Sequence, residues 1–179
     1  MTARPGLPTF ILTGIAVAVA VAGCSGGGGT NDASPSAAGP TGPCDKAAFV
    51  AHAGLASGAV STYVWQPFEK GAFKEGAKDR AKAMAAAQKA SVLAAHELTA
   101  GKPLVTGCVQ GTRLLNALTT GASLTTAAGK QFAAGKPNTE TLAGANSILT
   151  TIVAEAKLVG IDVGTMQPTD EQLAAGKAS

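Results

Sequence analysis

The chain has 179 residues and a formal net charge of +3, and its composition is 46% hydrophobic, 4% aromatic and 14% charged. These values exclude a collagen, a disulfide-dense miniprotein, a membrane protein with several spans and a strongly basic nucleic-acid binder. Most of the hydrophobic residues are alanine and valine, so we expect a single folded domain with a small, closely packed core and no nucleic-acid partner.

Residues 1–23 have the pattern of an export signal. Arg4 precedes an uncharged apolar run, Phe10 to Ala22. As a helix this run would be about 20 Å long, which is too short to span comfortably a bilayer core of about 30 Å. We therefore predict a cleaved signal peptide over residues 1–23 and not a membrane-spanning helix.

The signal ends in Val21-Ala22-Gly23-Cys24, which resembles the lipobox of bacterial lipoproteins, where an aliphatic and two small residues precede a cysteine. The resemblance implies cleavage before Cys24, a diacylglyceryl thioether on its sulfur and usually a further acyl group, such as palmitate, on the new amino terminus. Two or more acyl chains anchor a protein stably. The resemblance therefore implies a protein on the extracytoplasmic face of the cell membrane. An ordinary secretory signal with an incidental cysteine is the alternative.

The segment after the lipobox has the composition of a flexible tether. Residues 25–43 read SGGGGTNDASPSAAGPTGP and carry one charge. A Gly/Ser/Pro-rich linker of this length spans on the order of 25 Å. We therefore assign residues 24–43 to the lipidated cysteine and its tether, and residues 44–179 to the folded domain.

The cysteine count predicts a disulfide. If Cys24 is lipidated, Cys44 and Cys108 remain as an even pair in an oxidising compartment, and neither belongs to a Cys-x-x-Cys motif. Closing a loop of roughly 64 residues stabilises a fold by about 4 kcal/mol in the chain-entropy model.

The folded part lacks sustained alternation of apolar and polar residues, and its apolar residues recur three and four positions apart. This pattern predicts an all-α domain. The first helix is expected to begin after Asp45 and to end before Pro67. The second is expected over about residues 76–100, with Gly101 and Pro103 as its stop.

The third predicted helix begins near Gly107, with a kink or break between Gly121 and Thr126. The fourth follows Asn138 and ends at Gly160, and it has the clearest apolar periodicity. A capping-box pattern over residues 169–172 predicts a short C-terminal helix.

We expect these helices to form a four-helix up-down bundle, because such a topology places Cys44 and Cys108 at the same end. Two Gly-x-x-x-Gly spacings, at Gly54 and at Gly107, favour close backbone approach in a core with few large side chains.

Tyr63, Trp65, Phe68 and Phe73 form the most unusual segment, with four of the six aromatic residues that follow the leader. Such a cluster either plugs the end of the core, which the shortage of other large side chains favours, or forms the wall of a ligand pocket. With His96 downstream, this segment resembles one found in uncharacterised exported actinobacterial proteins, over about residues 49–99. That resemblance implies a helical exported domain and no catalytic residues.

The sequence contains little that indicates catalysis. Residues 44–179 contain no Gly-x-Ser-x-Gly motif, most of the carboxylates are scattered singly, and the cysteines are already assigned. His52 and His96 are the only histidines; they could meet across an antiparallel helix pair near Glu97, but hydrogen-bonded or surface histidines are the simpler reading. We therefore predict no enzyme, no cofactor and no metal site, with these histidines as weak candidates.

The sequence thus predicts a lipid-anchored binding or interaction module in the cell envelope, with an envelope protein or a cell-wall partner. The first alternative is a carrier that holds a small apolar ligand near Trp65, Phe68 and Phe73. The second is a metal or haem protein that uses His52 and His96.

Overall fold

The computed structural model describes residues 42–108 and 112–176 of the chain. The predicted signal peptide (residues 1–23), Cys24 and the tether up to residue 41 lie outside the described residues. Every regular element within the described ranges is helical, which confirms the all-α class. The elements are α1 (Lys46–Val60), a π-helical turn η1 (Ser61–Trp65), α2 (Gln66–Glu69), α3 (Arg80–Leu104), α4 (Arg113–Ala133), α5 (Thr139–Leu158) and α6 (Asp170–Ala175).

Helix α1 begins where predicted, because the Asp45 side chain accepts a hydrogen bond from the Ala48 N–H at 2.9 Å. Helix α1 itself ends at Val60, but the helical path does not end before Pro67 as predicted. The π-helical turn η1 continues the helical path into α2, and Pro67 lies in the first turn of α2. A proline is tolerated there because the first N–H groups of a helix have no partner within it.

Helix α3 continues through its predicted stop. Gly101 is buried inside the helix, and a Cβ atom there would lie 3.4 Å from the side chains of His52 and Phe49 on α1. The glycine therefore allows α1 to pack closely and does not end the helix. Pro103 falls in the last turn, and α3 ends at Leu104, directly after it.

Helix α4 is continuous, so the predicted break in its Thr-rich stretch is wrong. The hydroxyls of Ser123, Thr125 and Thr126 each donate a hydrogen bond to the backbone carbonyl four residues earlier, at 3.0, 2.8 and 2.8 Å. These bonds satisfy the hydroxyls within the helix. Gly121 packs against Leu98 of α3, so its missing side chain serves helix packing.

The two C-terminal helices begin where predicted, and a side chain caps the first turn of each. Asn138 accepts hydrogen bonds from the N–H groups of Glu140 and Thr141 at 2.8 and 3.1 Å, and Gly160, with φ +73°, follows the end of α5. Thr169 and Gln172 form the capping box of α6.

A disulfide joins the segment before α1 to the segment after α3. Cys44 and Cys108 are bonded, with their Cα atoms 4.9 Å apart, which confirms the predicted pairing. Two backbone hydrogen bonds flank the disulfide, from Asp45 N–H to Leu104 O (2.9 Å) and from Gly107 N–H to Pro43 O (3.0 Å). The start of α1 is therefore fixed against the end of α3, and the two helices run antiparallel.

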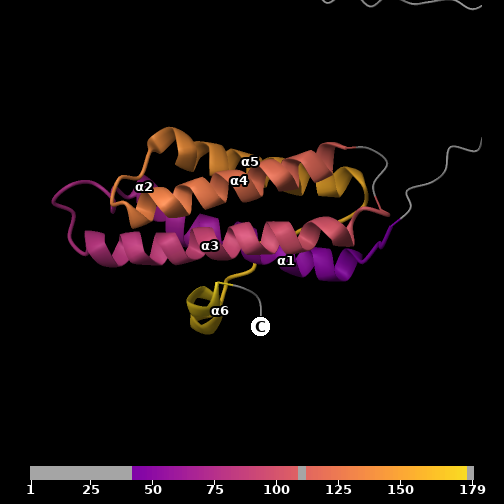
Figure 1. The fold of residues 1–179 in the computed structure, drawn as a ribbon, viewed down its shortest axis with the longest axis horizontal. Coiled ribbons are helices and arrows are strands. Elements are labelled where there is room, and N and C mark those ends of the chain that lie inside the picture. The colour runs from indigo at the N-terminus through magenta and orange to yellow at the C-terminus, as the bar shows by residue number, and fades with distance from the viewer. Residues whose placement is uncertain (1–41, 109–111, 177–179) are drawn as a thin grey trace, which may run out of the picture. The chain divides into compact units, whose positions relative to one another are not determined.

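Helix α3 packs against both α1 and α4, and α5 packs against α4 and more lightly against α1. Figure 1 shows the long helices α3 and α4 side by side, with α5 behind α4. Gln131, near the end of α4, donates a hydrogen bond to Thr141, near the start of α5, at 2.9 Å, so these helices are also antiparallel.

The core combines a few large side chains with many alanines. The largest apolar side chains that are fully buried are Phe49, Val60, Val64, Leu93, Leu98, Val105, Leu118, Leu142 and Ile152. Alanines fill the positions between them, so the helix backbones must approach closely to exclude water.

Residues 161–169, which connect α5 to α6 along the chain, form an extended segment that crosses α1; we call it the C-terminal strap. The Met166 N–H donates a hydrogen bond to the Gly54 carbonyl at 3.0 Å, and a Cβ atom on Gly58 would overlap the Met166 carbonyl oxygen. The Gly54-x-x-x-Gly58 pattern thus does permit close backbone approach. Its partner is the strap, however, and not another helix.

One described stretch, Lys46–Glu69, is long and apolar enough to cross a membrane by length and composition, with a mean hydropathy of 1.2. Half of its most apolar window is buried inside the domain. The core helix of a soluble protein meets the same criterion, so this is weak evidence for a membrane span.

Removal of the disulfide should destabilise the domain strongly. We expect the Cys44→Ser, Cys108→Ser double variant to lose about 4 kcal/mol of unfolding free energy, because the unfolded chain is freed from a long closed loop. Urea denaturation followed by circular dichroism measures this loss. The Cys24→Ser variant is the control and should unfold at the same urea concentration as the parent; equal stability of all three proteins would contradict the role assigned to the disulfide.

Gly58→Ala should weaken the contact between α1 and the strap. The added methyl group overlaps backbone that cannot rotate away, so we expect a loss of about 1–3 kcal/mol in urea denaturation. Gly144→Ala on α5 is the matched control, because its Cβ atom would lie at an ordinary 3.6 Å from Leu124. This variant should be as stable as the parent or more stable by up to about 1 kcal/mol. A Gly58→Ala protein that matched Gly144→Ala would refute the close approach.

Candidate functional site

The four aromatic residues of the predicted ligand patch do not form one surface. Phe73 is only 7% exposed and packs against Phe132 of α4, with ring centroids 4.9 Å apart, so it plugs the end of the core. Trp65 and Phe68 are partly buried and contact each other, with centroids 5.5 Å apart. Tyr63 lines a different groove, with Lys89 on α3 and residues of α6.

Phe68 and Phe73 line a groove of about 430 Å³, the aromatic groove, between the α2–α3 connection and the start of α5. Leu142 adds an apolar surface, and Glu69 and Lys74 place charges of opposite sign on the lining. Apolar walls with a few polar groups at the rim are typical of sites for small organic ligands.

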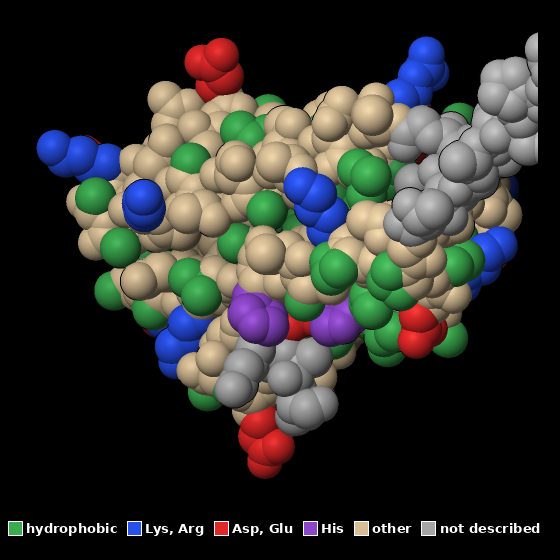
Figure 2. All heavy atoms as spheres, turned by 45° about the vertical axis from the view of Figure 1, so that its right-hand side comes forward, with side chains coloured by type: hydrophobic (Ala, Val, Ile, Leu, Met, Phe, Trp, Pro, Cys, Tyr) green, Lys and Arg blue, Asp and Glu red, His purple; other side chains and the backbone are tan. Residues whose placement is uncertain are grey.

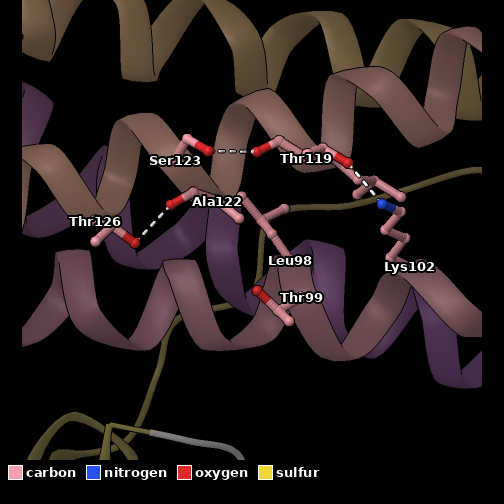
Figure 3. Close-up of a pocket in the computed structure, with 8 residues that line it drawn as sticks. Leu98, Thr99, Lys102, Thr119, Ala122, Ser123 and Thr126 are labelled. Atoms are coloured by element: carbon pink, nitrogen blue, oxygen red, sulfur yellow. Dashed lines mark hydrogen bonds between the residues drawn. The ribbon is translucent and has the colours of Figure 1, made fainter.

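A second groove, the hydroxyl groove, lies between α3 and α4 and has a volume of about 420 Å³. Figure 3 shows that the hydroxyls of Thr119, Ser123 and Thr126 follow one face of α4 opposite Thr99 of α3. At one end, the Lys102 ammonium donates a hydrogen bond to the Thr119 hydroxyl at 2.8 Å.

The hydroxyls of this groove have a defined hydrogen-bonding capacity. Those of Thr119, Ser123 and Thr126 each donate to a carbonyl of their own helix, so what they offer a ligand is acceptor lone pairs. This groove was not predicted from the sequence. The sequence feature that could have indicated it is the spacing of Thr119, Ser123 and Thr126, four and then three residues apart, which places these side chains on one face of a helix.

A buried carboxylate connects the two histidines of the chain. The Nδ1 atom of His52, on α1, lies 2.5 Å from one carboxylate oxygen of Glu97, and the Nδ1 atom of His96 lies 3.1 Å from the other. The Glu97 side chain is 0% exposed, whereas the side chains of His52 and His96 are 25% and 49% exposed. The structure therefore brings together across α1 and α3 the three residues that the sequence analysis considered.

Figure 2 shows both histidine side chains on one face of the molecule, with an acidic side chain visible between them. No group of three or more His, Cys, Asp and Glu side chains is arranged to hold a metal ion within residues 42–108 and 112–176.

Comparisons with protein-family models, with curated proteins and with solved structures find no match for this chain. The resemblances to bacterial lipoproteins and to exported actinobacterial proteins therefore stay predictions, as does the expectation that the chain is not an enzyme.

Proposed function

We propose that this protein is a lipid-anchored binding module on the extracytoplasmic face of the cell membrane. In this proposal the acyl chains on Cys24 hold the protein at the membrane, and residues 25–43 tether the domain. The observation that most supports an extracytoplasmic location is the disulfide between Cys44 and Cys108, because structural disulfides form and persist in oxidising compartments outside the cytoplasm. The lipobox pattern supports the anchor.

The domain that the tether carries is proposed to be a four-helix up-down bundle. The packing of α3 on α1 and α4, and of α5 on α4 and α1, supports this arrangement. The aromatic groove and the hydroxyl groove offer surfaces of different chemistry for binding. The proposed partner is an envelope protein or a cell-wall polymer, and neither nucleic acid nor a resident cofactor is part of the proposal.

Lipidation can be tested in a bacterial host that processes lipoproteins. The full chain should incorporate an alkyne-labelled palmitate and enter the membrane fraction, and the Cys24→Ala variant should lose the label, because the thioether needs the cysteine sulfur. Mass spectrometry of the amino-terminal peptide should identify Cys24 as the first residue of the mature chain.

The Cys44→Ala variant is the matched control for this experiment and should keep both the label and the membrane association. Label that persists in the Cys24→Ala variant, or a mature chain that begins elsewhere, would contradict the proposed anchor.

A second candidate function is the transport of a small apolar ligand, which the aromatic groove specifically favours. Trp65 is the only tryptophan in the chain and contacts Phe68 of the groove, so its fluorescence reports on occupancy. The probe is 1-anilinonaphthalene-8-sulfonate, which should quench Trp65 in a saturable titration.

The Thr139→Phe variant should fill the aromatic groove and weaken this binding by roughly tenfold or more, which corresponds to about 1.4 kcal/mol. Thr126→Phe makes the same change in the hydroxyl groove and should leave probe binding unaltered. Quenching that fails to saturate, or that is equal in the two variants, would rule out the aromatic groove as the ligand site.

A further inference from the structure

The two imidazoles of the chain are fixed by one buried acid. Each oxygen of the Glu97 carboxylate lies within hydrogen-bond distance of one histidine Nδ1 atom, at 2.5 Å for His52 and 3.1 Å for His96. A carboxylate accepts hydrogen bonds, so each ring donates from Nδ1. Because Glu97 is fully buried, its position is set by the core and not by solvent.

This arrangement determines which nitrogen of each ring is available. A neutral imidazole that donates from Nδ1 has its lone pair on Nε2. Among the described residues, no hydrogen bond is formed by Nε2 of His52 or of His96. Both side chains reach the surface on the same face of the molecule (Figure 2).

A carboxylate that holds the Nδ1–H of a histidine is the usual support of a metal-binding imidazole. It fixes the tautomer and the orientation of the ring and raises the basicity of the coordinating nitrogen. Here one carboxylate orients two imidazoles from two helices, and both remain partly exposed.

We propose that His52 and His96 form, through their Nε2 atoms, a surface site for one divalent transition-metal ion, with Glu97 as the positioning residue. Imidazole nitrogen favours zinc, copper and nickel over magnesium and calcium, which prefer oxygen ligands. Two protein ligands leave the remaining coordination positions to water. This site goes beyond the proposed membrane-anchored function and does not depend on it.

The composition of the chain makes the test direct, because no other histidine is present and the cysteines of the domain form a disulfide. The probe is Zn²⁺, titrated into the purified full-length Cys24→Ser protein without an affinity tag, so that no thiol competes for the ion, and followed by isothermal titration calorimetry. We expect one ion per chain, and we expect His52→Ala and His96→Ala each to weaken binding by roughly tenfold or more.

The Glu97→Gln variant tests the positioning role. It should weaken Zn²⁺ binding by roughly 10- to 100-fold, as substitutions of such supporting partners do, with both imidazoles still present. Glu140→Gln is the matched control, because Glu140 is exposed in the first turn of α5 and far along the chain from both histidines, and it should bind as the parent does. Circular dichroism of each variant without metal verifies that it is folded.

A measurement on the parent protein avoids any effect of substitution on folding. In long-range ¹H–¹⁵N NMR spectra, Zn²⁺ should shift the Nε2 resonances of both rings, and the Nδ1 atoms should stay protonated. Absence of Zn²⁺ binding, binding that neither histidine variant weakens, or a shift confined to one ring would overturn the two-imidazole site.

Discussion

The disulfide between Cys44 and Cys108 sets the pairing of α1 and α3, on which the rest of the domain is built. It lies between two backbone hydrogen bonds that join the start of α1 to the end of α3. From this end the two helices run antiparallel, and about two turns along α1 His52 meets Glu97. The histidine cluster therefore depends on a register that the covalent bond fixes. An alanine-rich core buries little apolar area per residue, so we expect a covalent constraint to supply a large share of the stability.

Small side chains impose the second constraint, because helices with alanine at their contacts must approach closely to exclude water. Glycines occur where the approach is closest: Gly101 faces α1, and Gly121 packs between α3 and α5. Gly58 instead accommodates the extended C-terminal strap. Where α3 packs closely against α1 and α4, side chains at the edge of each helix–helix contact remain exposed. The hydroxyl groove and the paired histidines lie at such edges, so both surfaces follow from the same packing.

The sequence predicted those features that depend on local chemistry. The helix class, the cap at Thr169 and the disulfide followed from periodicity, hydrogen-bonding capacity and cysteine count. It failed where tertiary packing overrides local preference. Gly121 and the threonines after it weaken an isolated helix, but packing and hydroxyl-to-carbonyl bonds stabilise α4 there. In the strap, the buried residues Ile161 and Val163 lie two positions apart, as in an extended chain. This alternation of buried and exposed residues is too short to predict an extended segment from the sequence. For the candidate site, the meeting of His52 and His96 near Glu97 was one of the possibilities that the sequence left open. That Glu97 is fully buried and shared between them was not predicted.

We propose that this domain folds with its cysteines paired in an oxidising compartment outside the cytoplasm. Thiol trapping in cells that express the full chain tests this claim most directly. The cells are quenched with acid, the proteins are denatured, and free thiols are alkylated before mass spectrometry. We predict that Cys44 and Cys108 escape alkylation unless a reductant is added first. Alkylation of both residues without reductant would show that the chain folds in a reducing environment and would contradict the account.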